Sequence, residues 1–296
     1  MGQRPEPAPG VLYVVGTPIG HLGDLSPRAR ELLASVSAIA CEDTRHSGQL
    51  LSRIGAQGHR YSFHQHNTQN RIPQFLKLLS EDQSLAVISD AGLPGISDPG
   101  EELVAAARAE GHEVICIPGP CAATTALVSS GLPSGQFCFE GFLPPRGRHR
   151  RERLSAIARE PRTTVIYEAP HRLIQLLGEL LEQCGADRPL QVARELTKCH
   201  EQQVGPTVHA ALEHFQECKP LGECTLVLGG QPAPEQPAKS DEEWRAELKA
   251  LMAEGASASD AARQLALQSG RSRRGLYALL HQSEQVQNNN NSQEAN

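Results

Sequence analysis

Short apolar blocks recur along the first 130 residues, each followed by a turn and then by a stretch with helical spacing. The blocks cover residues 11–15, 38–41, 85–88 and 113–117. Apolar runs of this length, bounded by turn residues, are typical of buried parallel strands. The amphipathic stretches between them predict the helices that cross from strand to strand. We therefore expect a parallel α/β sheet in this part of the chain.

The alternation continues after a glycine-rich joint at residues 131–135, with further strands predicted at 136–140, 163–167, 190–193 and 223–228. A proline-rich segment follows, and then three short helical patterns with a helix-turn-helix type of break at residues 269–271. The fold class is therefore α/β, with two α/β domains and a small helical module. The predicted parts are a flexible leader (1–10), an N-terminal domain (11–130), a second domain (131–230), a linker (231–240), the helical module (241–282) and a disordered tail (283–296).

Composition limits the environment and the partners of the protein. Its 296 residues carry a net charge of −6, so any contact with RNA must use a local basic patch. The eight cysteines are scattered without a Cys-x-x-Cys pair, which predicts reduced, buried thiols. With no signal peptide or membrane-length apolar run in view, we expect a cytoplasmic protein. His64 and His66 lack a third ligand at suitable spacing, so no metal is predicted.

The loop SDAGLPGISDPG, residues 89–100, follows one of the predicted buried strands. Open α/β sheets bind ligands at the carboxyl ends of their strands, and glycine allows a close approach of the backbone. Asp98 precedes a helical pattern at residues 101–110 and is predicted to be its N-cap. Asp90 has no such local use and is a candidate to bind a cation or a sugar hydroxyl. The alternative is an ordinary strand-to-helix connection.

Two more loops of this kind follow strands at residues 16–24 and 118–123. Neither the GxGxxG spacing of dinucleotide sites nor the Gly-Lys-Ser/Thr of phosphate-binding loops is present. Because the carboxyl ends of parallel strands share one edge of a sheet, the three loops together predict a ligand site there. Glu42 and Asp43 end another strand at the same edge. They either complement a helix dipole or act in the site.

Five arginines lie within the eight residues 146–153 of this acidic protein. The run is either a solvated charged face or a clamp for RNA phosphates, which the forked guanidinium fits well. The same two interpretations stay open for Arg172, Arg194 and Lys198. The basic turn with Arg271, Arg273 and Arg274 in the helical module is compatible with nucleic-acid contact or with plain packing.

Seven motifs, taken together, resemble the 16S ribosomal RNA cytidine 2′-O-methyltransferase family, which has the tetrapyrrole-methylase fold. The resemblance runs from about residue 11 to residue 230, and His21 stands where the family pattern has asparagine. It implies two α/β domains with S-adenosylmethionine in the cleft between them, a homodimer, and methylation of a ribose in the assembled small subunit. The motifs are GTPIGHLGD (16–24), EDTRHS (42–47), SDAGLPGISDPG (89–100), PGPCA (118–122), GFLPPRG (141–147), YEAPHR (167–172) and RELTK (194–198).

The resemblance and the small residues of the loops together suggest roles for individual positions. A ribose hydroxyl is a poor nucleophile, and a positioned base would help it. Alternatives are a tetrapyrrole C-methyltransferase, a diphthine-type protein methyltransferase, or a non-catalytic ribosome-assembly factor that needs no tight cofactor pocket. The candidates are Pro18, Asp90, Ala91, Gly92, Ile96, Ser97, Ala122, Ala123, Ala169 and Thr225 for the cofactor, Glu42, Asp43 and Glu195 for catalysis, and Arg45, Arg146, Arg148, Arg172, Arg194 and Lys198 for RNA.

Overall fold

The computed structural model describes residues 5–231, 239–269 and 271–280. The chain divides after Gln231 into two compact units. The larger unit contains two five-stranded sheets, and the smaller one is helical. The predicted tail, much of the linker, and the first four residues of the leader fall outside the described residues.

The first sheet is parallel throughout, as predicted, with the strand order β3-β2-β4-β1-β5. Its strands β1, β2 and β4 are buried along their whole length, which explains their continuous apolar sequences. The sequence analysis did not locate β3, which is more polar and lies at the edge of the sheet. The strands are β1 (Leu12–Val15), β2 (Ala38–Cys41), β3 (His59–Ser62), β4 (Leu85–Ile88) and β5 (Val114–Ile117).

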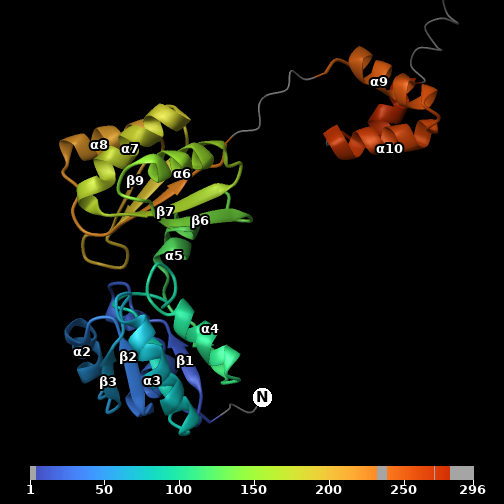
Figure 1. Ribbon diagram of the computed structural model, residues 1–296. Coiled ribbons are helices and arrows are strands. Elements are labelled where there is room, and N and C mark those ends of the chain that lie inside the picture. Colours follow the sequence, from blue (N-terminus) through green and yellow to red (C-terminus); the bar gives the residue numbers. More distant parts are fainter. Residues whose placement is uncertain (1–4, 232–238, 270, 281–296) are drawn as a thin grey trace, which may run out of the picture. The chain divides into compact units, whose positions relative to one another are not determined.

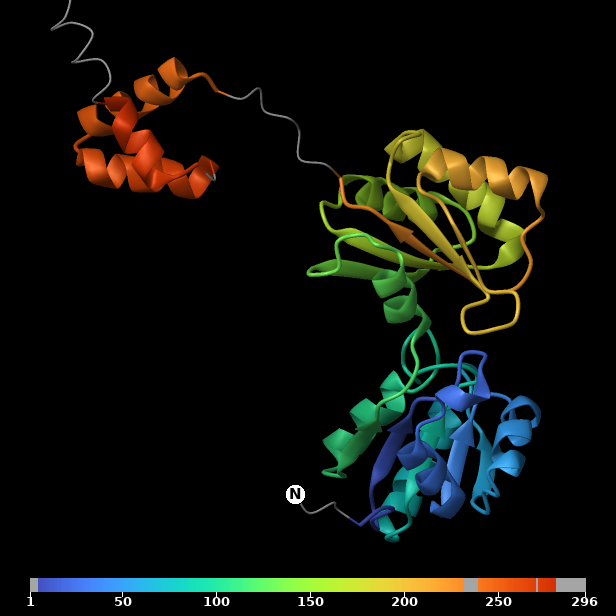
Figure 2. The same ribbon diagram turned by 180° about the vertical axis from the view of Figure 1, so that it is seen from behind.

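Helices cover both faces of the first sheet. Leu32 of α1 and Leu51 of α2 pack with Tyr13 on one face, while α3 and α4 contribute Phe75 and Leu103 to the other. Figure 1 shows α3 and α4 beside the strands, and Figure 2 shows the sheet from behind. The elements are η1 (Leu22–Asp24), α1 (Pro27–Ser35), α2 (Thr44–Arg53), α3 (Thr68–Ser80) and α4 (Glu101–Ala109).

The second sheet is mixed, with the order β6-β7-β10-β8-β9; β6 and β7 are parallel, and β10 runs antiparallel to both of its neighbours. Helices α6, α7 and α8 gather on one face (Figure 1), and α5 packs on the other. Here β9 and α8 were missed from the sequence. The elements are α5 (Ala122–Ser129), β6 (Phe137–Phe142), α6 (Arg148–Arg159), β7 (Thr163–Glu168), α7 (Pro170–Cys184), β8 (Leu190–Arg194), β9 (Gln202–Val204), α8 (Val208–Glu217) and β10 (Cys224–Leu228).

Helix α5 ties the two sheets together. The sequence analysis placed it at the end of the first domain, yet Ala126 and Leu127 belong to a buried cluster with Val165 and Val227 of the second sheet. Ile19, from the loop after β1, enters the same cluster. The small, apolar sequence of α5 suits this position, because it must fit between a sheet and a neighbouring loop.

The arginine run from residue 148 onward forms the first half of α6, and Arg146 precedes the helix. The run is not uniformly solvated. Arg150 is only 2% exposed. Its Nε donates to Glu179 Oε2 at 2.9 Å, and its Nη1 donates to the carbonyl of Pro144 at 2.9 Å. The helical period turns this one arginine toward the protein, whereas Arg148 and Arg151 on the same helix are exposed. Arg150 therefore has a structural role.

The described part of the leader contacts the first α/β half. Ala8 N–H donates to the Tyr13 hydroxyl at 2.8 Å, and Arg28 Nε donates to Glu6 at 2.8 Å.

The prediction of buried cysteines was wrong in part: all eight are free thiols, but Cys116, Cys199 and Cys218 are exposed. Among the described helices, none has the length and apolar character needed to cross a membrane.

The smaller unit packs α9 (Asp241–Ala253) and α10 (Ala258–Ser269) with a further helical stretch at residues 273–280. Its core contains Leu248, Leu265 and Leu276, at positions that the helical periodicity predicts. Ser240 and Glu243 form a reciprocal capping box at the start of α9. Three helices around one small core agree with the predicted module.

Candidate functional site

A cavity of about 360 Å³ lies where the loops after β1, β4 and β5 meet the second sheet. We call it the first cavity. Its volume falls within the range of small-molecule sites. Most of the lining side chains are small or apolar, and the polar exceptions are mainly carboxylates. The lining residues are Ile19, Asp90, Ala91, Gly92, Leu93, Ile96, Ser97, Asp98, Cys121, Ala122, Phe142, Tyr167, Glu168, Ala169, Pro170, Glu223, Cys224 and Thr225.

The predicted convergence of three loops is confirmed. Thr17 and Gly92 exchange backbone hydrogen bonds of 2.9 and 3.2 Å, so the loop after β1 pairs with the loop after β4. The loop after β5 approaches equally closely: a Cβ on Gly16 would lie 2.7 Å from Gly119 Cα. A side chain on either glycine would clash with the backbone of the other loop, so both positions require glycine. The three loops form one continuous rim.

Eight of the ten cofactor candidates line the first cavity. The exceptions are Pro18 and Ala123. Pro18 lines a neighbouring second cavity of about 410 Å³, between α2 and the loops after β1 and β4. Ala123 is buried behind the rim, where its N–H donates to the Tyr167 hydroxyl at 3.0 Å. The eight are Asp90, Ala91, Gly92, Ile96, Ser97, Ala122, Ala169 and Thr225.

The prediction that Asp98 caps a helix was wrong. Helix α4 begins at Glu101, and its N-cap is Gly100 with a φ of 151°. Asp98 instead lines the first cavity. Burial, with Glu42 and Asp90 close by, raises the pKa of Asp98 to about 6, and a hydrogen bond with Ser89 opposes the rise. The cap prediction failed because the chain makes one more turn before the helix starts.

Asp90 is held in place by the start of α2. Its Oδ1 accepts from the backbone N–H of Asp43 and from the Ser47 hydroxyl, both at 3.3 Å. Ser47 is buried, so this support is protected from solvent. Asp90 lines both cavities and therefore stands in the wall between them.

Glu168 is a site residue that the sequence analysis did not single out. It is 1% exposed and lines the first cavity at the end of β7. Arg172 forms an ion pair with Oε1, and Arg150 Nη1 lies 3.6 Å from Oε2. Oε2 accepts no hydrogen bond from the described residues. A buried carboxylate oxygen in this state is a candidate to accept one from a ligand. The sequence did contain a signal for Glu168, because the residue belongs to the motif YEAPHR, which also contains the cofactor candidate Ala169.

The three catalytic candidates lie around the cavities without lining them. Burial and the nearby Asp90 raise the pKa of Glu42. Asp43 caps α2, and its hydrogen bonds from Arg45 lower its pKa to about 2. Glu195 is partly buried, but a hydrogen bond from the Glu223 N–H and one from Lys198 leave its pKa lowered. Of the three, Glu42 has the greatest tendency to hold a proton.

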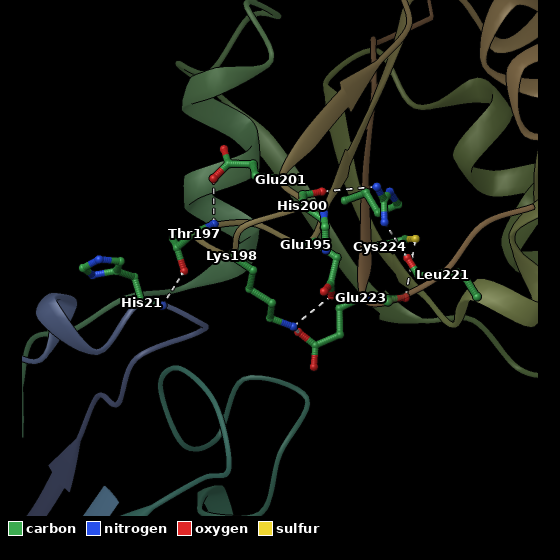
Figure 3. Close-up of polar contacts among 11 residues, drawn as sticks. His21, Glu195, Thr197, Lys198, His200, Glu201, Leu221, Glu223 and Cys224 are labelled. Atoms are coloured by element: carbon green, nitrogen blue, oxygen red, sulfur yellow. Dashed lines mark hydrogen bonds and ion pairs between the residues drawn. The ribbon is translucent and has the colours of Figure 1, made fainter. Parts of the chain in front are cut away.

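The six candidates for RNA binding differ in solvent exposure and in whether they already form ion pairs or hydrogen bonds within the protein. Arg146 is exposed and has no ion pair with a described residue. Arg45 and Arg148 are exposed but pair with Asp43 and Glu152. The remaining three are partly buried and already bonded within the protein. Arg172 pairs with Glu168, and Arg194 donates to Gln202, Leu221 and His200. Lys198 bonds to Glu195 and Glu223 (Figure 3). No group of three metal-ligating side chains forms among the described residues.

A family model identifies the class. Residues 11–212 match that of the Tetrapyrrole (Corrin/Porphyrin) Methylases, and the chain belongs to this family. The solved uroporphyrin-III C-methyl transferase from Thermus thermophilus complexed with S-adenyl homocysteine has the same fold. It superposes with a TM-score of 0.52 at 20% identity, over 74% of this chain and 96% of that one.

Within the family, the chain is similar to proteins named Ribosomal RNA small subunit methyltransferase I. The protein of that name from Synechocystis sp. is 48% identical over 270 residues, which cover 91% of this chain and 97% of the relative. The one from Thermotoga maritima is 45% identical over 222 residues, covering 75% of this chain and 99% of the relative. Since 222 residues make up nearly all of that relative, it lacks the length for both units of this chain.

Proposed function

We propose that this protein transfers a methyl group from S-adenosylmethionine to the ribose 2′-hydroxyl of a cytidine in 16S ribosomal RNA of the small ribosomal subunit. The observation that carries the proposal is the first cavity, a space of small-molecule size lined by small residues and carboxylates. The names of the relatives supply the class of substrate. A ribosomal substrate in turn supports a cytoplasmic location.

The residues present fit the cofactor. S-adenosylmethionine is cationic at sulfur, and when bound it supplies an electrophilic methyl group. The described residues that line the first cavity include Asp90, Asp98 and Glu168 but no lysine or arginine. This charge favours a cation, and the described lining contributes no amine that would compete as a nucleophile. Oε2 of Glu168, which accepts no hydrogen bond from a described residue, would receive a polar part of the ligand, and the small side chains of Ala122 and Ala169 would receive its flat part.

Glu42 is our choice among the catalytic candidates to accept the hydroxyl proton. Its raised pKa keeps it closer to the working pH than the two carboxylates whose pKa is lowered, Asp43 and Glu195. Glu42→Gln should lower the rate of transfer while cofactor affinity holds. A variant with the full rate would exclude Glu42 as the base, and the search would then turn to Asp43 and Glu195.

The experiment that tests the activity uses small subunits purified from cells that lack this modification. Transfer of labelled methyl from S-adenosylmethionine is followed by nuclease digestion and mass spectrometry of the RNA. The expected product is a cytidine methylated on its ribose. Label on a base, or no label in the RNA while the cofactor binds, would refute the proposal. Free 16S RNA in a parallel reaction tests whether the assembled subunit is required.

We also propose a homodimer. The edge strand β6 exposes aromatic side chains, among them Phe137 at 39% and Phe142 at 54%. An unpaired edge strand with exposed aromatic residues is a surface that a second copy would bury. Analytical ultracentrifugation should give twice the chain mass, and Phe137→Glu should shift the protein toward the monomer. A wild-type protein that sediments as a monomer at micromolar concentration would exclude the dimer.

A further inference from the structure

The second cavity abuts the first. It has a volume of about 410 Å³ and shares Ile19, Asp90, Ala91 and Glu223 with the first cavity. A molecule in the second cavity therefore lies against one wall of the first. Transfer of a group between two bound molecules needs their reacting atoms side by side and aligned. Two adjoining cavities of comparable size provide that arrangement.

The two cavities differ in charge. The second one is lined by Arg53, His46 and Lys198 together with the shared carboxylates Asp90 and Glu223. The first has four carboxylates and no lysine or arginine among its described residues. Arg53 and His46 are exposed, and neither forms an ion pair with a described residue. An unpaired guanidinium beside a cavity favours an anionic ligand such as a phosphate, and an imidazole N–H can donate a hydrogen bond to the same ligand. Arg53 thus distinguishes the second cavity from the first, because the first has no free guanidinium in its described lining.

Lys198 lines the second cavity, and its side chain bonds to Glu223 (Figure 3), a residue that lines both cavities. Its Nζ donates to Glu195 Oε1 at 2.9 Å and to Glu223 Oε2 at 2.8 Å. The first α/β half holds the lysine stem from the other side, since a Cβ on Gly20 would lie 2.5 Å from Lys198 Cγ. These contacts raise the pKa of Lys198 despite its partial burial, so the ammonium stays charged. It can therefore donate to a ligand but not act as a base.

We propose that the second cavity binds the acceptor nucleotide, a ribonucleotide of a single-stranded RNA segment. Its phosphate would lie against Arg53 and His46, and Lys198 and Glu223 would orient the ribose toward the common wall. The exposed amide of Gln49 can hydrogen-bond the edge of the base. This assignment rests on the proposed function, because it names the place where that substrate enters.

Charge reversal at Arg53 tests the assignment kinetically. Arg53→Glu should lower kcat/KM for small subunits at least about tenfold, because attraction for a phosphate becomes repulsion. Affinity for S-adenosylmethionine, measured by calorimetry, should stay within about twofold. The matched control is Arg30→Glu on α1, an exposed arginine that lines neither cavity. Equal effects of the two variants, or a loss of cofactor affinity in Arg53→Glu, would overturn the assignment.

Crosslinking tests it without any turnover. A short single-stranded RNA with 4-thiouridine, irradiated with the full-length chain, should modify residues 44–53 or Lys198, and Arg53→Glu should reduce the yield. Crosslinks confined to α6 or to residues 239–280, or none at all, would refute the acceptor cavity even if methyl transfer occurs. Crosslinks on α2 in a protein that transfers no methyl group would instead refute the proposed function and leave the RNA site in place.

Discussion

Thr17 and Gly92 exchange two backbone hydrogen bonds, of 2.9 and 3.2 Å, across 75 positions of sequence. The pair brings the loop after β1 onto the loop after β4, and Thr17 is 1% exposed, so water does not compete for these bonds. These two hydrogen bonds therefore join two of the three loops that form the rim of the first cavity. Loops joined in this way position their small residues and backbone groups for a ligand at a lower entropic cost.

Asp90→Ala should weaken the binding of S-adenosylmethionine about tenfold to a hundredfold. The variant removes a carboxylate that Asp43 and Ser47 hold at the cavity wall, and hydrogen bonds to charged groups contribute about 1.5–3 kcal/mol. Calorimetry measures the change. Asp187→Ala, which removes an exposed acid elsewhere, should leave affinity unchanged. Wild-type affinity in Asp90→Ala would show that Asp90 does not contact the cofactor.

Cofactor affinity should depend on pH through Asp98. Its pKa is raised to about 6, so the carboxylate that favours a cationic ligand is lost as pH falls from about 7 to about 5. Wild-type affinity should fall over this interval, and Asp98→Asn should show a flatter profile. Calorimetric titrations at several pH values measure both. Parallel profiles in the two proteins would remove Asp98 from the binding site.

The same residue predicts a pH-dependent stability of the free protein. A carboxyl whose pKa is higher in the folded state favours folding below its ordinary pKa of 3.8, and this contribution is lost as pH rises through about 6. Asp98→Asn should therefore be more stable than the wild type near neutral pH by about 1 kcal/mol, a figure discounted for partial exposure. Urea unfolding at about pH 7.5 and about pH 4.5 tests this. The difference should be clearly smaller at the lower pH, where Asp98 is protonated in the folded state.

Two glycines are predicted to respond in opposite directions to alanine. Gly16→Ala should destabilise the protein by about 1–3 kcal/mol, because its Cβ would meet Gly119 Cα at 2.7 Å. Gly178→Ala in α7 should stabilise it by about 0.5–1 kcal/mol, since nothing lies within 4 Å of the added carbon. Urea unfolding measures both. Equal stability of Gly16→Ala and wild type would mean that the rim is less tightly packed than its geometry indicates.

Removing Arg146 and Arg148 together should weaken binding to the small subunit without changing cofactor affinity. Both side chains are exposed, and each arginine that binds a phosphate contributes about 1 to the slope of log Kd against log salt, so the slope should decrease. Filter binding at several salt concentrations gives the slope. Arg162→Ala, which removes an exposed arginine paired with Glu160, serves as the control. A double variant with the slope of the control would exclude this helix from the RNA interface.

The sequence predicted the α/β architecture because burial on both faces makes strands such as β2 and β4 continuously apolar. It failed where an element is short or amphipathic at an edge, as for β3 and β9, because polar residues there are exposed to solvent and give no apolar run. The arginine run illustrates a different limit. Its composition suggested a surface, but the helical period of α6 directs Arg150 to the buried carboxylate of Glu168 and the half-buried one of Glu179.

By itself, the sequence determined eight of the ten described strands, the three loops and eight of the residues that line the first cavity, because these depend on local apolar patterning and on small residues within single segments. Only the tertiary structure decided that Asp98 lines a cavity instead of capping a helix, and that Lys198 stands between Glu195 and Glu223. Both outcomes depend on contacts between segments far apart in the chain. Such contacts set burial and charge pairing, which no local pattern records.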